Sequence, residues 1–125
     1  MAAVATLIVD GANVVGSRPD GWWRDRAGAA ARLHTRLRAA DLPYAEIVLV
    51  LEGQARPGVP AGSDGPVRTV HAPADGDATI ADLARRAVAE DSRVVVVTAD
   101  RALAATVQDA GAEIVGPGWL LDQVT

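Results

Sequence analysis

The stretch that most constrains the fold is an apolar run that ends in an acid, Leu7-Ile8-Val9-Asp10. Consecutive large aliphatic residues are typical of a strand buried on both faces, as in the middle of a parallel sheet. Ligands of such open sheets bind beyond the carboxyl ends of the strands, which is where Asp10 lies. A carboxylate at this place is costly unless a cation, a proton or hydrogen-bond donors compensate it. Any fold for this chain must therefore compensate Asp10.

Alternating apolar segments predict the rest of the architecture. Further strands are predicted at residues 47–51, 67–71, 94–97 and 113–115. Apolar residues at helical spacing predict helices over residues 23–40, 78–90 and 101–110, while residues 11–21 and 54–66, rich in Gly and Pro, are expected to be loops. Strands that alternate with helices favour right-handed crossovers and a parallel sheet. The fold expected for residues 1–125 is a single α/β domain, a three-layer α/β/α sandwich around a mostly parallel sheet of about five strands.

The composition favours a globular, cytoplasmic protein. Half of the 125 residues are hydrophobic, and there is no cysteine for a disulfide or a thiolate metal site. No apolar run approaches the roughly 20 residues of a membrane span. The first residues, Met1-Ala2-Ala3-Val4, lack the basic start and long apolar core of a signal peptide.

The charge of the chain does not favour binding of nucleic acid by bulk electrostatics, because the formal net charge is −4. However, all 12 basic residues are arginine, the side chain best suited to bidentate contact with phosphate. The nucleotide composition of the source genome would explain the same arginine usage.

Acids from distant parts of the sequence are expected to meet at the carboxyl edge of the sheet. Asp10, Glu52 and Asp100 each follow a buried strand, and Asp77 begins the helix that leads to the next strand. Carboxylates gathered in this way repel one another and raise each other's pKa. A hard cation removes that conflict, and all-oxygen ligation suits Mg²⁺ or Mn²⁺. Such a site can activate a water for phosphodiester hydrolysis.

Each of these acids also has a structural interpretation. Asp77 and Asp100 precede helices and are candidates for N-caps, and Asp75 could cap in place of Asp77. Glu52 would then be an ordinary loop acid. Only Asp10, at a strand end in the middle of the sheet, has no cap to provide.

Aromatic and basic residues near the same edge are candidates for contacts with RNA. Trp22 and Trp23 lie in the loop that leaves the Asp10 edge, where one is expected inside and the other available to stack on an unpaired base. Phosphate contacts are predicted for basic residues close to the acids: Arg18, Arg24, Arg26 and Arg101. A solvated helix start paired with Asp25 is the alternative for the residues near Trp23.

Other polar and aromatic residues are expected to serve the fold. Asp82 lies roughly 140° round its helix from Asp77, so it is better placed to pair with Arg85 or Arg86. Trp119 is expected to pack against the sheet. The exposed face of the first long helix is expected to carry three arginines, Arg32, Arg36 and Arg38.

Four segments together resemble a known family. Val9-Asp10-Gly11-Ala12-Asn13-Val14-Val15 resembles the opening of bacterial PIN-like ribonuclease domains of the NYN and YacP type. Asp77-Ala78-Thr79-Ile80-Ala81-Asp82-Leu83-Ala84 resembles their acid-bearing helix. Val97-Thr98-Ala99-Asp100 resembles the Thr/Ser-x-Asp at a strand end of PIN domains, and Val50-Leu51-Glu52-Gly53 resembles their second strand, where Asp-Gly is more usual. The similarity spans nearly the whole chain in the right order.

The resemblance implies a Mg²⁺- or Mn²⁺-dependent endoribonuclease, acting on RNA that is expected to be single-stranded. Asp10, Asp77 and Asp100 would hold metal, with Glu52 as a further ligand in place of the commoner aspartate. Asn13 would orient a water on the metal or one of the acids. Arg101 follows Asp100 with no further acid, so a second ion would be held poorly.

Two alternatives remain open from the sequence. One is a catalytically silent PIN-like module that binds RNA or a protein partner, including a second copy of the chain. The other is a small-molecule phosphatase, which would need a second acid two positions after a nucleophilic aspartate. Ala12 occupies that position after Asp10, so this alternative ranks low.

Overall fold

The computed structural model describes residues 5–90 and 92–124. The single domain expected over residues 1–125 therefore extends beyond the described residues. The expectation that Met1-Ala2-Ala3-Val4 is not the start of a signal peptide lies wholly outside them. The described chain forms one sheet in the order β3-β4-β2-β1-β5-β6. Every neighbouring pair is parallel except β3 with β4. The strands are β1 Ala5–Asp10, β2 Glu46–Leu51, β3 Gly62–Asp64, β4 Val67–His71, β5 Arg93–Val97 and β6 Glu113–Val115.

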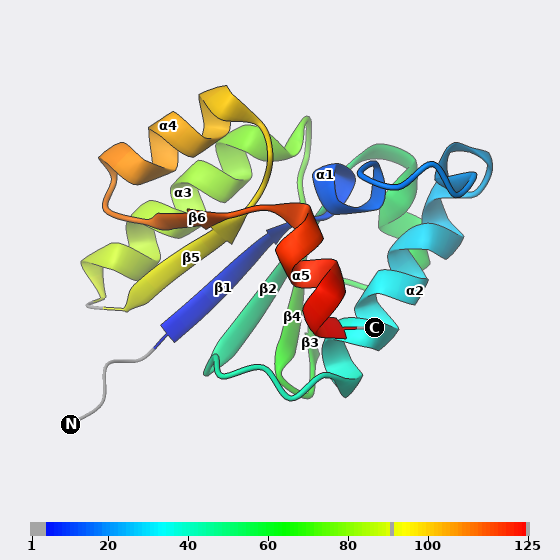
Figure 1. The fold of residues 1–125 in the computed structure, drawn as a ribbon, viewed down its shortest axis with the longest axis horizontal. Coiled ribbons are helices and arrows are strands. Elements are labelled where there is room, and N and C mark those ends of the chain that lie inside the picture. Colours follow the sequence, from blue (N-terminus) through cyan, green and yellow to red (C-terminus); the bar gives the residue numbers. More distant parts are fainter. Residues whose placement is uncertain (1–4, 91, 125) are drawn as a thin grey trace.

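Helices cover both faces of this sheet. They are α1 Gly11–Val15, α2 Arg26–Ala39, α3 Gly76–Ala89, α4 Arg101–Asp109 and α5 Pro117–Val124, with 3₁₀ turns η1 Trp22–Arg24 and η2 Gly53–Gly58. Figure 1 shows α3 and α4 on one face, and α1, α2 and α5 on the other. The prediction of a three-layer α/β/α sandwich is therefore confirmed.

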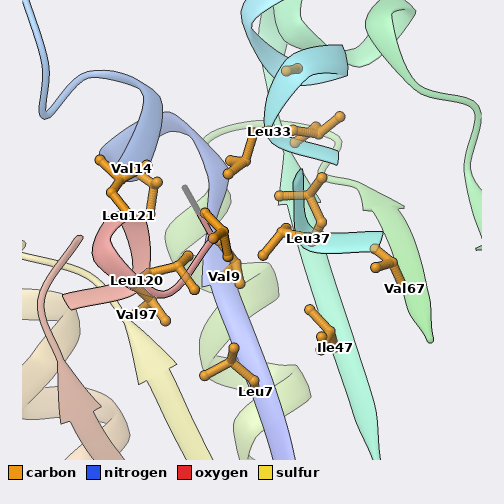
Figure 2. Close-up of a cluster of buried hydrophobic side chains, with 14 of the residues drawn as sticks. Leu7, Val9, Val14, Leu33, Leu37, Ile47, Val67, Val97, Leu120 and Leu121 are labelled. Carbon is orange, nitrogen blue, oxygen red and sulfur yellow. The ribbon is translucent and has the colours of Figure 1, made fainter. Parts of the chain in front are cut away.

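The sheet separates two apolar cores because side chains alternate along each strand. Leu7 and Val9 of β1 join the core beneath α1, α2 and α5, which Figure 2 shows together with Leu37 and Leu120. Ile8, between them in sequence, joins the other core beneath α3 and α4. The same alternation fixes the face on which side chains at the strand ends emerge.

The prediction of about five strands was one short. Residues 54–66, expected to be a loop, contain the end of η2 and the edge strand β3. All three residues of β3 are exposed, so no apolar alternation marks the strand in the sequence. Backbone pairing of Gly62–Asp64 with β4 creates it.

Two other segments also differ from prediction, and one had none. Residues 11–21, expected to be a loop, begin with the short helix α1. The chain after Gly116, for which no element was predicted, forms helix α5. The first long helix begins at Arg26 after its N-cap Asp25, so the predicted start at residue 23 was wrong.

Individual side chains confirm one expectation and contradict another. Asp82 pairs with Arg86 at 3.0 Å, as predicted. Trp119 does not pack into the sheet, because it lies in the first turn of α5 with 37% of its surface exposed. No helix in residues 5–90 and 92–124 combines the length and apolar character needed to cross a membrane.

Candidate active site

Asp10 is the buried acid from which the site is built. It ends β1, between β2 and β5, and keeps only 7% of its surface exposed. The Thr98 hydroxyl donates a hydrogen bond to its Oδ2 at 3.0 Å, and the Asn13 N–H donates to its Oδ1 at 3.4 Å. Asp10 is thereby the N-cap of α1, so the expectation that it has no cap to provide was wrong: the chain turns into a helix directly after the strand. Burial nevertheless raises the pKa of Asp10, helped by the charges of Asp77 and Glu52, and outweighs these two bonds.

The register of the sheet explains why the other acids lie near Asp10. Val9 is opposite Val97, so Thr98 comes next to Asp10 on the β5 side. Asp10 is opposite Val50, so Glu52 lies two residues further along, just after the last residue of β2. Asp10 lies two residues after Ile8, and alternation directs it to the face that α3 and α4 cover. Acids at the beginnings of those helices therefore reach the same edge.

The first turn of α3 contains two aspartates with different roles. Asp75 is the N-cap, and its Oδ1 accepts the N–H of Asp77 at 3.0 Å. The alternative that Asp75 caps in place of Asp77 is thus confirmed. The Asp77 carboxylate accepts no hydrogen bond from the described residues. Partial burial and the nearby charges of Asp100, Asp75 and Glu52 raise its pKa.

Glu52 and Asp100 each hold a helix start with one carboxylate oxygen. The Gly76 N–H of α3 donates a hydrogen bond to Oε2 of Glu52. Asp100 is the N-cap of α4 and accepts the Leu103 N–H at 3.0 Å through Oδ1, which confirms the capping interpretation. Glu52 is therefore more than a loop acid, because it ties β2 to α3. We call Asp10, Glu52, Asp77 and Asp100 the acid rim.

The acid rim fits a hard cation in chemistry but is not arranged around one. No group of three acidic or histidine side chains in the described part of the chain is positioned to hold a metal ion. Oε1 of Glu52, Oδ2 of Asp100 and both oxygens of Asp77 accept no hydrogen bond there, so each residue keeps a carboxylate oxygen for a ligand. All of these donors are oxygens, as Mg²⁺ and Mn²⁺ prefer. Binding would require side-chain rotation towards a common centre.

Asn13 joins the first helix to the loop between β5 and α4. Its side-chain oxygen accepts the Ala99 N–H at 2.7 Å, while its own N–H is directed at Asp10. The backbone of Asn13 therefore contributes to orienting an acid, and its side chain instead holds the neighbouring loop. Its predicted action on a water remains a prediction.

A cavity of about 310 Å³ adjoins the acid rim, and Trp22, Arg26, Glu52 and Asp75 are among its lining residues. The guanidinium of Arg26 lies 5.1 Å from the centre of the Trp22 ring. Trp23 meets Trp22 edge-on with ring centres 5.9 Å apart, and half of its surface is exposed. Neither tryptophan lies in the core, so the expectation that one is inside was wrong. Trp22 instead forms a partly buried wall of this cavity.

The other predicted RNA-contacting residues are dispersed. Arg101 begins α4 directly after Asp100, and Arg24 lies over the exposed Trp23 ring at 6.0 Å. Arg18 does not line the cavity beside the acid rim. It lines a separate cavity together with Arg32 and Arg36.

Sequence reasoning gave no site role to Thr98 or to the capping carboxylate of Asp75. The hydroxyl of Thr98 is the side-chain donor to Asp10, and the register of β1 and β5 places it there. The signal was present in the Thr-x-Asp pattern, which was interpreted only for its acid. For Asp75, the pair Asp-Gly-Asp offered two capping candidates, and spacing alone did not decide between them.

No family model and no curated protein sequence matches the chain significantly. Among solved structures, the chain is similar to a crystal structure of a mutant of Rae1 (YacP) from Bacillus subtilis. The TM-score is 0.73 at 20% sequence identity, over 97% of this chain and 75% of that chain. The likeness shows that the chain has a YacP-like fold.

Proposed function

We propose that the protein is a metal-dependent endoribonuclease that hydrolyses single-stranded RNA at the acid rim. The observation that carries this proposal is Asp10, a buried carboxylate at the end of a central strand whose pKa is raised by burial and by neighbouring acids. An acid held in this way gains most from a cation. The YacP-like fold and the resemblance of the strand-end motifs support the same assignment.

The negative charge of the four rim carboxylates means that RNA binding there would require a metal ion. Without a cation, the rim acids would repel the phosphate of an RNA strand. Bound Mg²⁺ or Mn²⁺ would neutralise these carboxylates and supply an activated water and Lewis-acid stabilisation of the leaving oxygen. Asp10, Asp77 and Asp100 would hold the ion, with Glu52 as a further donor. Arg101, next to Asp100 in sequence, would bind a phosphate oxygen of the substrate.

The cavity beside the rim is the place for a base next to the cleaved bond. Trp22 supplies an aromatic wall, and stacking of one base on such a ring contributes about 1–3 kcal/mol. A base held there leaves its phosphate near Glu52, at the border between the cavity and the acid rim. Unpaired bases are the ones available for this contact, which is why the substrate class is single-stranded RNA.

The experiment is cleavage of a labelled single-stranded RNA in Mn²⁺ or Mg²⁺ by wild type, Asp10→Asn and Asp82→Asn. Asp82 is a matched control because it lies on α3 but pairs with Arg86. Wild type and Asp82→Asn are expected to cut at similar rates, and Asp10→Asn at least 100-fold more slowly. Cleavage that Asp10→Asn does not alter, or no cleavage by any of the three proteins, would contradict the proposal.

A second candidate is a catalytically silent module that binds RNA or a protein. The observation in its favour is that Asp10, Glu52 and Asp100 each accept a backbone N–H, and that the described acids form no group of three around one point. This candidate predicts that RNA retention or partner capture is the same for wild type and Asp77→Asn, with or without Mn²⁺. A loss of RNA affinity on removing Mn²⁺ from wild type would exclude it.

A further inference from the structure

A second cavity, of about 340 Å³, lies where α1, α2 and α5 meet. Its floor is apolar, with Val14, Leu33 and Leu121 among the lining residues. Arg18 approaches it from the segment after α1, and Arg32 and Arg36 approach it from α2. We call this the arginine cavity.

The arginines of this cavity have no acidic partner among the described residues. Arg18, Arg32 and Arg36 are exposed, and within residues 5–90 and 92–124 their side chains form no ion pair or hydrogen bond. Four other arginines are each paired with an acid, namely Arg38, Arg68, Arg86 and Arg93. Among the described residues that line the cavity, Asp20 is the one acid. The cavity therefore has an excess of positive charge, which an anion would balance.

The arginine cavity adjoins the cavity beside the acid rim. Val15, the last residue of α1, lines both of them. A single strand of RNA could thus extend from the acid rim, along Trp22 and over the end of α1, to Arg32 and Arg36. The order of groups along this route is acid rim, aromatic wall, then guanidinium groups.

We propose that the arginine cavity binds the phosphates of the RNA strand whose cleaved bond lies at the acid rim. This inference rests on the proposed function and adds the path of the substrate to it. Guanidinium groups match phosphate oxygens in geometry and charge. RNA fits the route better than an acidic peptide, because it offers a base for Trp22 between successive phosphates. An acidic peptide would instead place further carboxylates beside Glu52 and Asp75.

The test measures binding of a fluorescein-labelled single-stranded RNA of about 12 nucleotides, a length within the usual range of single-strand binding sites. All proteins carry Asp10→Asn, so that cleavage does not interfere, and binding is measured by anisotropy in EDTA at several salt concentrations. The test variant adds Arg32→Gln and Arg36→Gln. The matched control adds Arg85→Gln and Arg86→Gln, which remove the same charge from α3 on the opposite face of the sheet. Thermal melting checks that each variant is folded.

The Arg32→Gln/Arg36→Gln variant is expected to bind RNA about 10-fold or more weakly, since each lost contact is a charge-assisted one. The slope of log K against log salt should fall by about 1.4, because each phosphate contact on a single strand contributes about 0.7. The control should lose less than about 2-fold, as expected for bulk charge that is screened by salt. Equal losses in both variants, or no loss in the test variant, would overturn the proposal.

Two further outcomes separate this inference from the proposed function. If wild type cuts no RNA in Mn²⁺ but its RNA affinity depends on Arg32 and Arg36, the nuclease assignment fails and RNA binding by the arginine cavity is still supported. If wild type cuts RNA but its RNA affinity does not depend on Arg32 and Arg36, only the proposal that the arginine cavity binds RNA is overturned. Polyglutamate that displaces the RNA at equal charge concentration would also overturn it, because the cavity would then accept acidic peptides equally well.

Discussion

The Thr98 hydroxyl donates to Oδ2 of Asp10 at 3.0 Å and accepts the N–H of Asp100 at 3.1 Å. One side chain thereby links the acid that ends β1 with the residue that caps α4. The link depends on the pairing of β1 with β5, in which Val9 lies opposite Val97. The position of the acid rim is thus set by strand register, before any ligand is present.

Replacing Thr98 by valine should destabilise the protein at neutral pH. Valine keeps the shape of the side chain but leaves the buried Asp10 carboxylate without its side-chain donor, at a cost of about 1–3 kcal/mol. Urea denaturation at pH 7 measures this loss. Thr106→Val is the control, because Thr106 is exposed and bonds only its own helix. A Thr98→Val protein as stable as that control would show that the hydrogen bond contributes nothing.

Asp77→Asn should stabilise the metal-free protein at neutral pH. Burial and nearby acids raise the folded-state pKa of Asp77 above its unfolded value of about 3.8. Between these two pKa values the folded protein binds more protons, so the free energy of unfolding falls as the pH rises. Asparagine does not ionise, so the free energy of unfolding of Asp77→Asn does not fall in this way. Its advantage should be present at pH 7 and vanish below pH 3.8.

Denaturation at several pH values measures this effect, with Asp82→Asn as the control. Asp82 pairs with Arg86, so its replacement should leave stability unchanged or lower it by up to about 1 kcal/mol. A wild type more stable than Asp77→Asn at pH 7 would mean that the neighbouring acids do not oppose one another.

Gly11→Ala should disrupt the turn from β1 into α1. A Cβ at Gly11 would lie 2.6 Å from the Val50 carbonyl oxygen and 2.9 Å from a methyl group of Leu51. The carbonyl belongs to the neighbouring strand and cannot move freely, so the expected cost is about 1–3 kcal/mol. Gly118→Ala, where no atom lies within 4 Å, should instead leave stability unchanged or raise it. Equal urea midpoints for the two variants would refute this steric explanation.

Mn²⁺ should raise the melting temperature of wild type and much less that of Asp10→Asn. At a metal concentration ten times the dissociation constant, binding adds about 1.4 kcal/mol of stability. In a domain of this size that corresponds to roughly 4–7 °C. Differential scanning fluorimetry with and without Mn²⁺ measures the shift. The same shift in both proteins would indicate a cation site elsewhere.

The parallel sheet and the gathering of acids were predictable because both follow from strand ends. Runs such as Val94 to Val97 are buried on both faces, and the acids that follow them leave the sheet at one edge. This is why the sequence alone predicts that Asp10, Glu52 and Asp100 share one edge. The face to which Asp10 points becomes clear only from the two cores, because Ile8 joins the core beneath α3 and α4.

The missed elements depend on tertiary contacts. Helix α1 contains a glycine and two valines, which are poor helix formers, and it begins at the N-cap Asp10 and packs against α2 and α5. Strand β3 exists only through its pairing with β4. The arginine cavity arises because α1 and α2 approach each other, so no spacing within the sequence brings Arg18 close to Arg32.

Anomalous scattering from a crystal soaked in Mn²⁺ would decide whether the acid rim is a metal site. The structure leads us to expect an anomalous peak within about 2.0–2.4 Å of carboxylate oxygens from Asp10, Asp77 and Asp100, with Glu52 nearby. It should be absent from Asp10→Asn crystals soaked in the same way. A wild-type map with no peak there, and with Asp100 and Glu52 still bonded to the backbone N–H groups of Leu103 and Gly76, would contradict a metal-dependent nuclease.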